Sequence, residues 1–450
     1  MLPALAMCFF TAAASAYEVH DGPTGVIKYD KEKSYNGYTL FTPTEDNTVI
    51  YLIDMRGDIV HTWKMTNGQG SPFVSRLLPN GNLLVYTSMN SAPVKIGGYT
   101  GLIEELDWDG KVVWSHTMCS KNEVSHHAFD RMPNGNTLML GWERVKPEEM
   151  LKRGRKPGFP KEILIRGEPT GDFWVDFVRE IDPSGKTVWE WHVMDHVGTS
   201  PDQLDPNYIL PKPAGPMYSS FDWTHFNTVE YIPGKDQVIL NSRNFSESMI
   251  VDKKTGKIIF RWGNPSTHGQ GARPSWFDDG SQKIFGSHHA TLLDNGNLSI
   301  FDNGSERPEG NRSRVIEVDI KSGEIVWEYA ANGYNSFYSH RQGAAQRLPN
   351  GNTLVTSTQQ GHLFEVTPAK EVVWEFVSPI VLGKNVGIFS DGDHVSRNKK
   401  GGAVPNMFGN MIHRSYRYGP DFSGFKGKDL SPKGYIVEGY PRFFEVWKKQ

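Results

Sequence analysis

The stretch 77–88, LLPNGNLLVYTS, joins two apolar runs through the tripeptide Asn-Gly-Asn. Asn-Gly tolerates positive φ and matches the twist of antiparallel strands, so this stretch predicts a β-hairpin with a tight turn. The pattern returns as RMPNGNTLMLGW (131–142), LLDNGNLSIFDN (292–303) and RLPNGNTLVTST (347–358), and YIPGKDQVILNS (231–242) is a variant with a longer turn. The chain is therefore built from repeated hairpins.

A second hairpin follows each of the first ones and ends on a tryptophan. Its copies are LIEELDWDGKVVWSH, FVREIDPSGKTVWEW, MIVDKKTGKIIFRW, RVIEVDIKSGEIVWEY and HLFEVTPAKEVVWEF, and VIYLIDMRGDIVHTW is the same unit near the N-terminus. Two hairpins per repeat make a four-stranded sheet, and such a repeat is typical of a β-propeller blade. We interpret the tryptophans as packing between blades. One such tryptophan ends each of six repeats, so we predict six blades. These residues are Trp63, Trp114, Trp189, Trp262, Trp327 and Trp374.

The first repeat lacks an innermost strand, because GYTLFTP (37–43) leads directly into its outer hairpin. We expect the C-terminal segment MIHRSYRYGP (411–420) to supply the missing strand and close the ring, which would leave no open sheet edge there. The predicted fold is an all-β, six-bladed propeller with four-stranded blades.

The 450 residues are predicted to form one propeller domain, 17–450, after a signal peptide at 1–16. MLPALAMCFFTAAASA has an apolar stretch followed by small residues, so we expect an exported protein, periplasmic or secreted. The net charge of -3 argues against a nucleic-acid partner, and no apolar run reaches the length of a membrane span. Charged segments rich in Pro and Gly near 143–175, 196–221 and 380–410 are expected surface insertions, some of them lids.

Histidines recur just before the first strand of four repeats. In a propeller the innermost strands line the central channel, so side chains at this position would converge on one axis although they are far apart in sequence. In each double histidine, strand alternation would direct one ring to the channel and the other into packing. A lone buried histidine is more often a hydrogen-bonded core residue, and the absence of an HExxH motif or paired cysteines gives no support for a metal site. The residues are His126, His127, His225, His288, His289 and His340.

Longer phrases resemble one family. DWTHFNTVEYIPGKDQVILNSRNFSESMIVD, FRWGNP, IFGSHHATLLDNGNLSIFDNG and GAAQRLPNGNTLVTSTQQGHLFEVTPAKEVVWEFVSP are similar to bacterial aryl-sulfate sulfotransferases. The resemblance runs from about residue 37 to the C-terminus and is strongest over 222–379. It implies a six-bladed periplasmic propeller that moves a sulfuryl group from a phenolic sulfate ester to another phenol, with no cofactor.

The resemblance also implies roles for four residues. His362 in QQGHLFEV falls where the family has its nucleophilic histidine, His225 and His288 match the two assisting histidines, and Arg307 matches the arginine. The implied mechanism is a ping-pong exchange through a transient sulfohistidine. If His362 faces away from the channel, His288 or His225 must be the nucleophile.

Other residues are expected to shape a pocket for the two small-molecule partners, a phenolic sulfate donor and a phenol acceptor. Aromatic side chains would stack on a phenyl ring, and arginines would hold sulfuryl oxygens. For each, ordinary packing or a surface ion pair is an equally good interpretation. The expected pocket residues are Arg243, Asn227, Tyr338, His127, His340, Arg341, Arg414 and Tyr416.

Two other functions stay open at this stage. The channel histidines could serve a lyase or hydrolase of anionic saccharides, or the propeller could be a noncatalytic binding module, because fold does not determine function. The sequence is compatible with a monomer or a homodimer.

Overall fold

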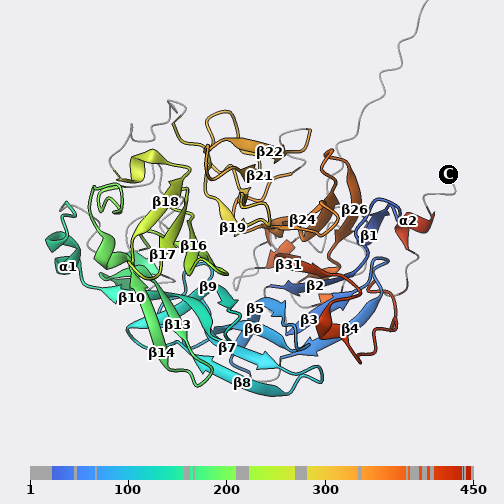
Figure 1. Cartoon of the computed structure of the whole chain (residues 1–450). Coiled ribbons are helices and arrows are strands. Elements are labelled where there is room, and N and C mark those ends of the chain that lie inside the picture. The colour runs from blue at the N-terminus through green and yellow to red at the C-terminus, as the bar shows by residue number, and fades with distance from the viewer. Residues whose placement is uncertain are drawn as a thin grey trace, which may run out of the picture.

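The computed structural model describes residues 23–44, 48–65, 68–156, 163–165, 168–208, 222–268, 281–332, 337–381, 384–385, 395–397, 403–405, 410–437, 439 and 442–446. Six antiparallel sheets stand around a central axis like the blades of a propeller (Figure 1). The predicted six-bladed β-propeller is confirmed. Residues 1–16, predicted to be a signal peptide, lie outside the described part of the chain.

Blades II to VI are meanders whose first strand is innermost. Blade II contains β5 (Gly70–Leu77), β6 (Leu83–Met89), β7 (Gly101–Leu106) and β8 (Val112–Thr117). Blade III contains β9 (Glu123–Arg131), β10 (Thr137–Val145), β13 (Phe173–Ile181) and β14 (Thr187–His192). Blade IV contains β15 (Phe226–Ile232), β16 (Gln237–Ser242), β17 (Glu247–Asp252) and β18 (Ile258–Trp262).

Blades V and VI follow the same order. Blade V contains β19 (His288–Leu292), β20 (Leu298–Asp302), β21 (Arg314–Val318) and β22 (Ile325–Tyr329). Blade VI contains β23 (Ala344–Arg347), β24 (Thr353–Ser357), β25 (His362–Val366) and β26 (Val372–Val377). It has a fifth strand that the sequence did not predict, β1 (Gly25–Tyr29), which pairs with β26 and covers its outer edge.

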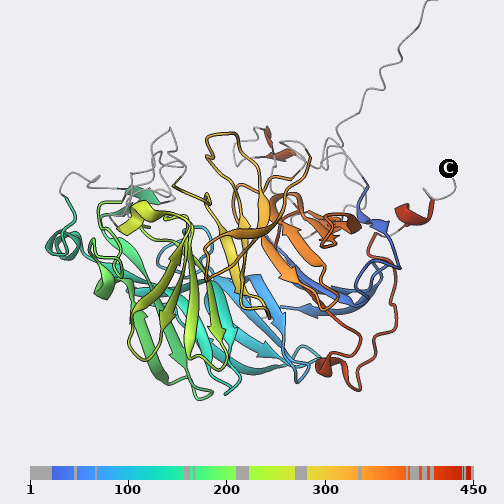
Figure 2. The same cartoon turned by 45° about the horizontal axis from the view of Figure 1, so that its top comes forward.

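Blade I joins the two ends of the chain. Its strands are β2 (Tyr38–Pro43), β3 (Val49–Ile53) and β4 (Ile59–Lys64), and its innermost strand is β31 (Ile412–Tyr418). Leu40 lies opposite Tyr416 in this antiparallel pair. The C-terminal segment therefore supplies the missing strand, as expected. In Figure 2 the red chain beyond β31 continues along the outside of the blue blade toward α2 (Phe443–Val446).

The six tryptophans link the blades in the order of the chain. Each indole N–H donates to a carbonyl of the following blade, and the last one, from Trp374 to Met55 of blade I (2.9 Å), closes the ring. The other five bonds are Trp63 to Asp107, Trp114 to Pro183, Trp189 to Lys253, Trp262 to Gly323 and Trp327 to Pro368. The interpretation of these residues as packing between blades is confirmed.

The Asn-Gly-Asn turns anchor a second set of links between blades. The last asparagine of each turn donates to a glutamate on the third strand, as Asn297 does to Glu317 (2.8 Å). That glutamate pairs with a cation of the next blade, here Arg347 (2.8 Å). The same arrangement recurs at Glu105 with Arg131, at Glu180 with Lys253 and at Glu365 with Arg417. The turns thus fix both the hairpins and the spacing of the blades.

The strand directions give the channel two distinct ends. All six innermost strands start at one end, which we call the histidine end, and finish at the other, the turn end, where the Asn-Gly-Asn turns lie. The insertions that begin near 143, 196 and 380 connect strands at the histidine end; parts of each lie outside the described residues. In the described part of the chain, no helix has the length and apolar character needed to cross a membrane.

Candidate active site

The predicted histidines lie where the innermost strands begin, and local bulges set their directions. The register shifts beside His127 on β9 and beside His289 on β19, and both residues have positive φ, 51° and 49°. His225, just before β15, has φ 48°. These backbone conformations are uncommon for residues other than glycine. They interrupt the strand alternation on which the choice within each double histidine was based.

His225 is held by an aspartate that precedes it by three residues. Its Nδ1 is hydrogen-bonded to Asp222 Oδ2, and the ring lies 4.6 Å from the ring of His127 on the neighbouring blade, centroid to centroid. Burial, and then the nearby Arg243, lower the pKa of His225 to about 3. The imidazole is therefore neutral at pH 7 and held by one of its nitrogens, as in an Asp–His pair that orients a catalytic ring.

The first double histidine divides its roles. His126 stacks on Trp142 (3.9 Å between centroids), and its Nε2 lies 3.1 Å from Asp176. The Nδ1 atoms of His126 and His127 lie 2.9 Å apart. Burial and then His225 lower the pKa of His127 well below 6.5. His127 is thus the member that faces the His225 ring of the neighbouring blade, whereas His126 is packed within blade III.

His288 has a defined tautomer. Its Nδ1 lies 2.7 Å from Asn303 Oδ1 and 3.0 Å from the Gly286 carbonyl, and both oxygens are acceptors, so Nδ1 carries the proton. Its Nε2 accepts a hydrogen bond from the backbone N–H of Gln342 in blade VI (3.1 Å). Burial, and then Arg243, lower the pKa of His288 well below 6.5. His288 therefore joins blades V and VI through both nitrogens while lying beside the other channel rings.

Arg243 connects these rings electrostatically. It follows β16, its amide N–H donates to the His225 carbonyl (3.1 Å), and the residue is buried. Its charge contributes to lowering the pKa values of His225, His288 and His340. Of the guanidiniums predicted for the site, Arg243 is the one whose field reaches the histidines of blades IV, V and VI.

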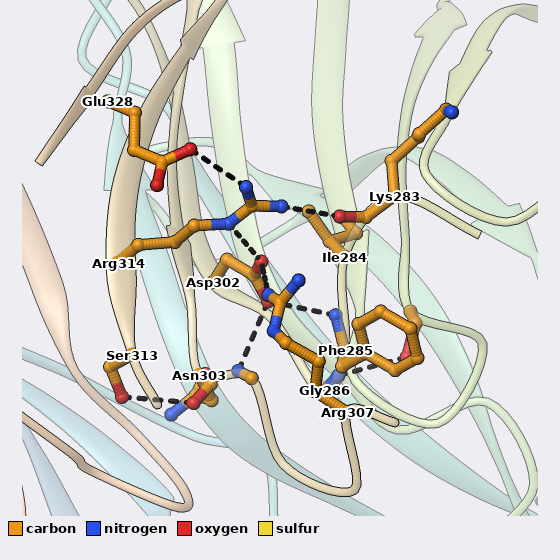
Figure 3. Close-up of polar contacts among 12 residues, drawn as sticks. Lys283, Ile284, Phe285, Gly286, Asp302, Asn303, Arg307, Ser313, Arg314 and Glu328 are labelled. Atoms are coloured by element: carbon orange, nitrogen blue, oxygen red, sulfur yellow. Dashed lines mark hydrogen bonds and ion pairs between the residues drawn. The ribbon is translucent and has the colours of Figure 1, made fainter. Parts of the chain in front are cut away.

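Arg307 lies in the loop after β20, at the same end of the channel. Figure 3 shows Arg307 and Arg314 meeting at the carboxylate of Asp302, with Arg314 also bound to Glu328 (2.8 Å). The Arg307 guanidinium also lies over the ring of Phe285 (4.9 Å). Because Asp302 is adjacent to Asn303, the partner of His288, one short segment positions both predicted residues.

His362 is the first residue of β25, the third strand of blade VI. Its Nε2 lies 3.4 Å from Glu375 on β26, and its ring lies 5.0 Å from Phe364. A third strand stands two inter-strand spacings from the innermost one, about 10 Å farther from the axis. Among the described residues, no ring contact or hydrogen bond joins His362 to His127, His225 or His288.

Three predicted pocket residues lie together on the segment before β23. The rings of Tyr338 and His340 are 6.5 Å apart. Burial, followed by Arg341 and Arg243, lowers the pKa of His340 to about 4. The His340 carbonyl accepts a hydrogen bond from Ser305 (2.6 Å) in the loop that carries Arg307. This segment therefore borders the histidine end from blade VI.

The other predicted pocket residues lie deeper in the channel. Asn227 Nδ2 donates to the Ser287 carbonyl (2.8 Å), and the Asn227 carbonyl accepts from Arg414 (2.6 Å). Tyr416 accepts from Arg76 (3.3 Å) and is two residues closer to the turn end than Arg414. These contacts join blades: Arg414 follows His413 directly on β31, and Tyr416 lies farther along that strand toward the turn end.

Sequence reasoning missed two residues of the site. Asp222 is the first residue of DWTHFN, and an acidic residue three positions before His225 could have been recognised as a partner for that histidine. His413 on β31 stacks on Phe73 (4.0 Å between centroids), and burial followed by Arg414 lowers its pKa well below 6.5. His413 could have been predicted as a channel residue, because it lies in the segment 411–420 that was expected to supply an innermost strand. We call His127, His225, His288 and His413 the histidine cluster.

The comparisons with known proteins concern the second half of the propeller most directly. Residues 161–380 match the family described as Arylsulfotransferase (ASST). The chain is 27% identical to arylsulfate sulfotransferase AssT of Lelliottia amnigena over 305 residues, 58% of this chain and 50% of that protein. It is also 27% identical to AssT of Escherichia coli O6:H1 over 320 residues, with the same shares. The resemblance seen in the sequence is confirmed, and the chain spans about half the length of the curated relatives it matches.

A solved structure with a similar arrangement of strands is a protein of unknown function from Bacteroides caccae. It has a TM-score of 0.47 and 12% identity, and the match covers 76% of this chain and 94% of the other. That likeness bears on neither activity nor substrate.

Proposed function

Because residues 161–380 match the arylsulfotransferase family, we propose that this protein moves a sulfuryl group from a phenolic sulfate ester to an acceptor phenol. The reaction takes place at the histidine end of the channel and proceeds through a transient sulfohistidine, without a cofactor. The observation that carries the proposal is the meeting of His127, His225 and His288, from three blades, beside the buried Arg243. The exchange has two balanced steps.

In the first step an imidazole nitrogen forms a bond to sulfur while the ester O–S bond breaks, and the donor leaves as phenolate. In the second step the acceptor oxygen forms a bond to the same sulfur, the N–S bond breaks and returns its electron pair to the imidazole, and the phenolic proton passes to solvent. A neutral imidazole suits this chemistry because its lone pair is available at pH 7. The lowered pKa values of the cluster keep its rings in that form.

Charge on the sulfuryl oxygens must be balanced where it develops. A sulfuryl group in transfer spreads negative charge over three oxygens, by analogy with phosphoryl transfer. Arg243 provides a fixed guanidinium inside a water-poor site, where such a donor is worth more than in water. Arg307 provides a second guanidinium at the same end of the channel, where it and Arg314 both bind the carboxylate of Asp302.

His225 fits the nucleophile best among the histidines. Asp222 is hydrogen-bonded to Nδ1 of His225 and orients the ring, and burial lowers the pKa of His225 to about 3, so the imidazole is neutral at pH 7. In His288 the Nε2 atom is already occupied by the Gln342 amide. His362 is engaged with Glu375 on an outer strand. We therefore assign the covalent step to His225. The resemblance implies His362 as the nucleophile instead, so an experiment that separates these two residues tests the assignment directly.

The proposal also includes the predictions on export, oligomeric state, domain extent and the surface insertions. The protein is exported, it acts on small molecules as a monomer or homodimer, and 17–450 form one domain. Some of the insertions near 143–175, 196–221 and 380–410 act as lids over the histidine end of the channel. Supporting this, all three connect strands at that end of the channel.

The test uses p-nitrophenyl sulfate as donor and phenol as acceptor, with release of nitrophenolate followed by absorbance. The proposal expects release that depends on phenol and parallel double-reciprocal lines when both substrates are varied. Release that does not depend on phenol would identify a sulfatase, and intersecting lines would indicate direct transfer in a ternary complex. No release from any aryl sulfate would overturn the assignment.

A further inference from the structure

His413 lies at a bulge near the start of the strand that closes the ring. The register of β31 against β2 shifts at His413 and Arg414, as the registers of β9 and β19 shift beside His127 and His289. Arg414 reaches across the axis and donates to the Asn227 carbonyl of blade IV (2.6 Å). At this level of the channel, therefore, side chains of β31 and of blade IV meet across the axis.

His413 and His225 belong to blades on opposite sides of the ring. The blades follow one another in chain order, so blade I stands three positions from blade IV in either direction (Figure 1). The His413 ring stacks on Phe73 (4.0 Å between centroids), and Phe73 lies 6.3 Å from the His127 ring. The His127 ring in turn lies 4.6 Å from that of His225. A substrate held between β31 and blade IV would therefore have a histidine on each side.

The His413 ring is buried without a hydrogen-bond partner. Its relative exposure is 0%, and neither ring nitrogen forms a hydrogen bond of normal geometry with the described residues. The His127 backbone weakly favours its protonation, but burial followed by Arg414 lowers the pKa well below 6.5. At pH 7 the neutral ring thus has one N–H donor and one lone pair that the described chain leaves unused. Such a group destabilises a fold unless something else binds it.

The other cluster rings differ in this respect. His225 is held by Asp222, and His288 is engaged through both nitrogens, by Asn303 and by Gln342. These contacts orient the two rings within the protein. His413 is oriented by stacking alone, so both of its nitrogens remain available to a bound molecule.

We propose that His413 is a further catalytic residue, which hydrogen-bonds the phenolic oxygen that leaves in the first step and the one that enters in the second. This inference rests on the proposed transfer through His225. In-line transfer places the attacking nitrogen and the departing oxygen on opposite sides of sulfur, by analogy with phosphoryl transfer. His413 stands on the side of the channel opposite His225, where that oxygen would lie.

The contribution of His413 is a hydrogen bond and not a proton transfer. When the ester O–S bond breaks, its electron pair stays on the phenolate oxygen, and the neutral ring donates its N–H to that oxygen while keeping the proton. The acceptor oxygen takes the same place before it attacks the sulfohistidine, and its own proton passes to solvent. Because a fixed donor is worth most where charge develops, the benefit should grow as the leaving phenol becomes a weaker acid.

The first test is binding of p-nitrophenolate to the full chain, measured by calorimetry beside nitrobenzene, which lacks the phenolic oxygen. His413→Phe should weaken p-nitrophenolate binding about tenfold, because a charge-assisted hydrogen bond is lost, and should leave nitrobenzene binding within about twofold. His413→Gln keeps an N–H donor and should restore part of the affinity. Equal p-nitrophenolate binding by the unchanged protein and His413→Phe, or no measurable binding by the unchanged protein, would overturn the proposal.

Urea unfolding shows whether His413→Phe is folded. This variant should be at least as stable as the unchanged protein, because it removes an unpaired polar group and keeps an aromatic ring on Phe73. His413→Leu provides the same comparison if the larger ring does not fit.

The second test compares two sulfate esters as donors. In His413→Phe, kcat/KM should fall about a hundredfold for phenyl sulfate but only about tenfold for p-nitrophenyl sulfate, whose leaving oxygen carries less charge. Equal losses for the two esters would mean that His413 does not touch the leaving oxygen, and would overturn the proposal.

His61→Phe is the matched control. His61 belongs to the same blade and stacks on Trp108 (4.1 Å), but it lies on the outer strand β4. Binding and both rates should be unchanged in this variant. His413-dependent p-nitrophenolate binding without turnover of either ester would overturn the proposed transfer while supporting His413 as the group that binds the phenolic oxygen. Turnover that does not depend on His413 would overturn this inference alone.

Discussion

The two ends of the channel are formed by the same six strands yet have opposite chemistry. The histidine end gathers imidazoles whose pKa values burial lowers, so they stay neutral and nucleophilic. The turn end gathers guanidiniums and carboxylates that tie one blade to the next. The turns are fixed by Asn-Gly-Asn in four repeats, whereas the loops at the histidine end differ in length from blade to blade. In this propeller the uniform end holds the ring together and the variable end holds the candidate reaction site.

The largest expected effect is the loss of sulfuryl transfer in His225→Ala. Removing the group that forms the covalent intermediate should lower kcat by about 10⁴-fold, because only binding and charge stabilisation remain. Stopped-flow or steady-state release of nitrophenolate measures it. His362→Gln is the control and should keep the rate within about threefold, since none of its described contacts reaches the cluster. A loss in His362→Gln equal to that in His225→Ala would return the nucleophile to His362.

At the turn end, removing a charged side chain should lower the stability of the fold rather than the rate of transfer. Arg417 and Glu365 are fully buried partners, and Arg417 also lies over Trp374 (4.2 Å). Arg417→Met should lower the free energy of unfolding by about 3–5 kcal/mol, because it leaves a buried carboxylate unpaired. Arg131→Met, in a more exposed pair of the same series, should cost about 1 kcal/mol. Equal losses in urea unfolding would show that burial does not set the strength of these links.

Asp222→Asn separates orientation from nucleophilicity at the histidine end. The amide keeps the shape of the side chain but can present a donor to Nδ1, which moves the ring proton to Nε2 and removes the attacking lone pair. We expect kcat to fall about a hundredfold while KM changes little. A change confined to KM would mean that Asp222 contributes only to binding.

The two ends should also respond oppositely to pH. The folded pKa of His225 is about 3 against about 6.5 unfolded, so the unfolded chain binds the extra proton and stability falls as pH drops below about 6.5. The folded pKa of Glu230 is about 8 against about 4.5, so the folded chain holds the extra proton and stability falls as pH rises from about 4.5 toward 8.

Glu230→Gln should therefore raise the free energy of unfolding by about 2 kcal/mol more at pH 8 than at pH 6. Urea titrations of both proteins at the two pH values measure the difference. An equal effect at both would show that Glu230 is already ionised at pH 6. Transfer itself should change less than about twofold between pH 7 and pH 5, because the lowered pKa of His225 keeps the imidazole neutral throughout.

The fold could be predicted from the sequence because its signals are local and repeated. Asn-Gly-Asn specifies a turn, each terminal tryptophan marks a blade, and the missing strand of blade I predicted closure by the segment that forms β31. The strand β1 was not predicted, because GVIKY has no repeat of its own and gains its place only by covering β26.

The site was predictable only in part, because side-chain direction depends on backbone geometry. The bulges at His127 and His289 interrupt the strand alternation from which we inferred which ring of each pair faces the channel. Asp222 is separated from His225 by a tight segment whose shape the sequence does not specify. Arg307 was expected to face the sulfuryl group directly, but its placement depends on Asp302, which also binds Arg314.

The most direct measurement is the identity of the residue that becomes sulfated. The protein is mixed with p-nitrophenyl sulfate in the absence of acceptor, quenched at alkaline pH and digested, and the peptides are sequenced by mass spectrometry. We predict one added sulfuryl group on His225, which disappears when phenol is supplied before the quench. A sulfuryl group found on His362 instead, or transfer that proceeds with no modified histidine, would contradict this assignment.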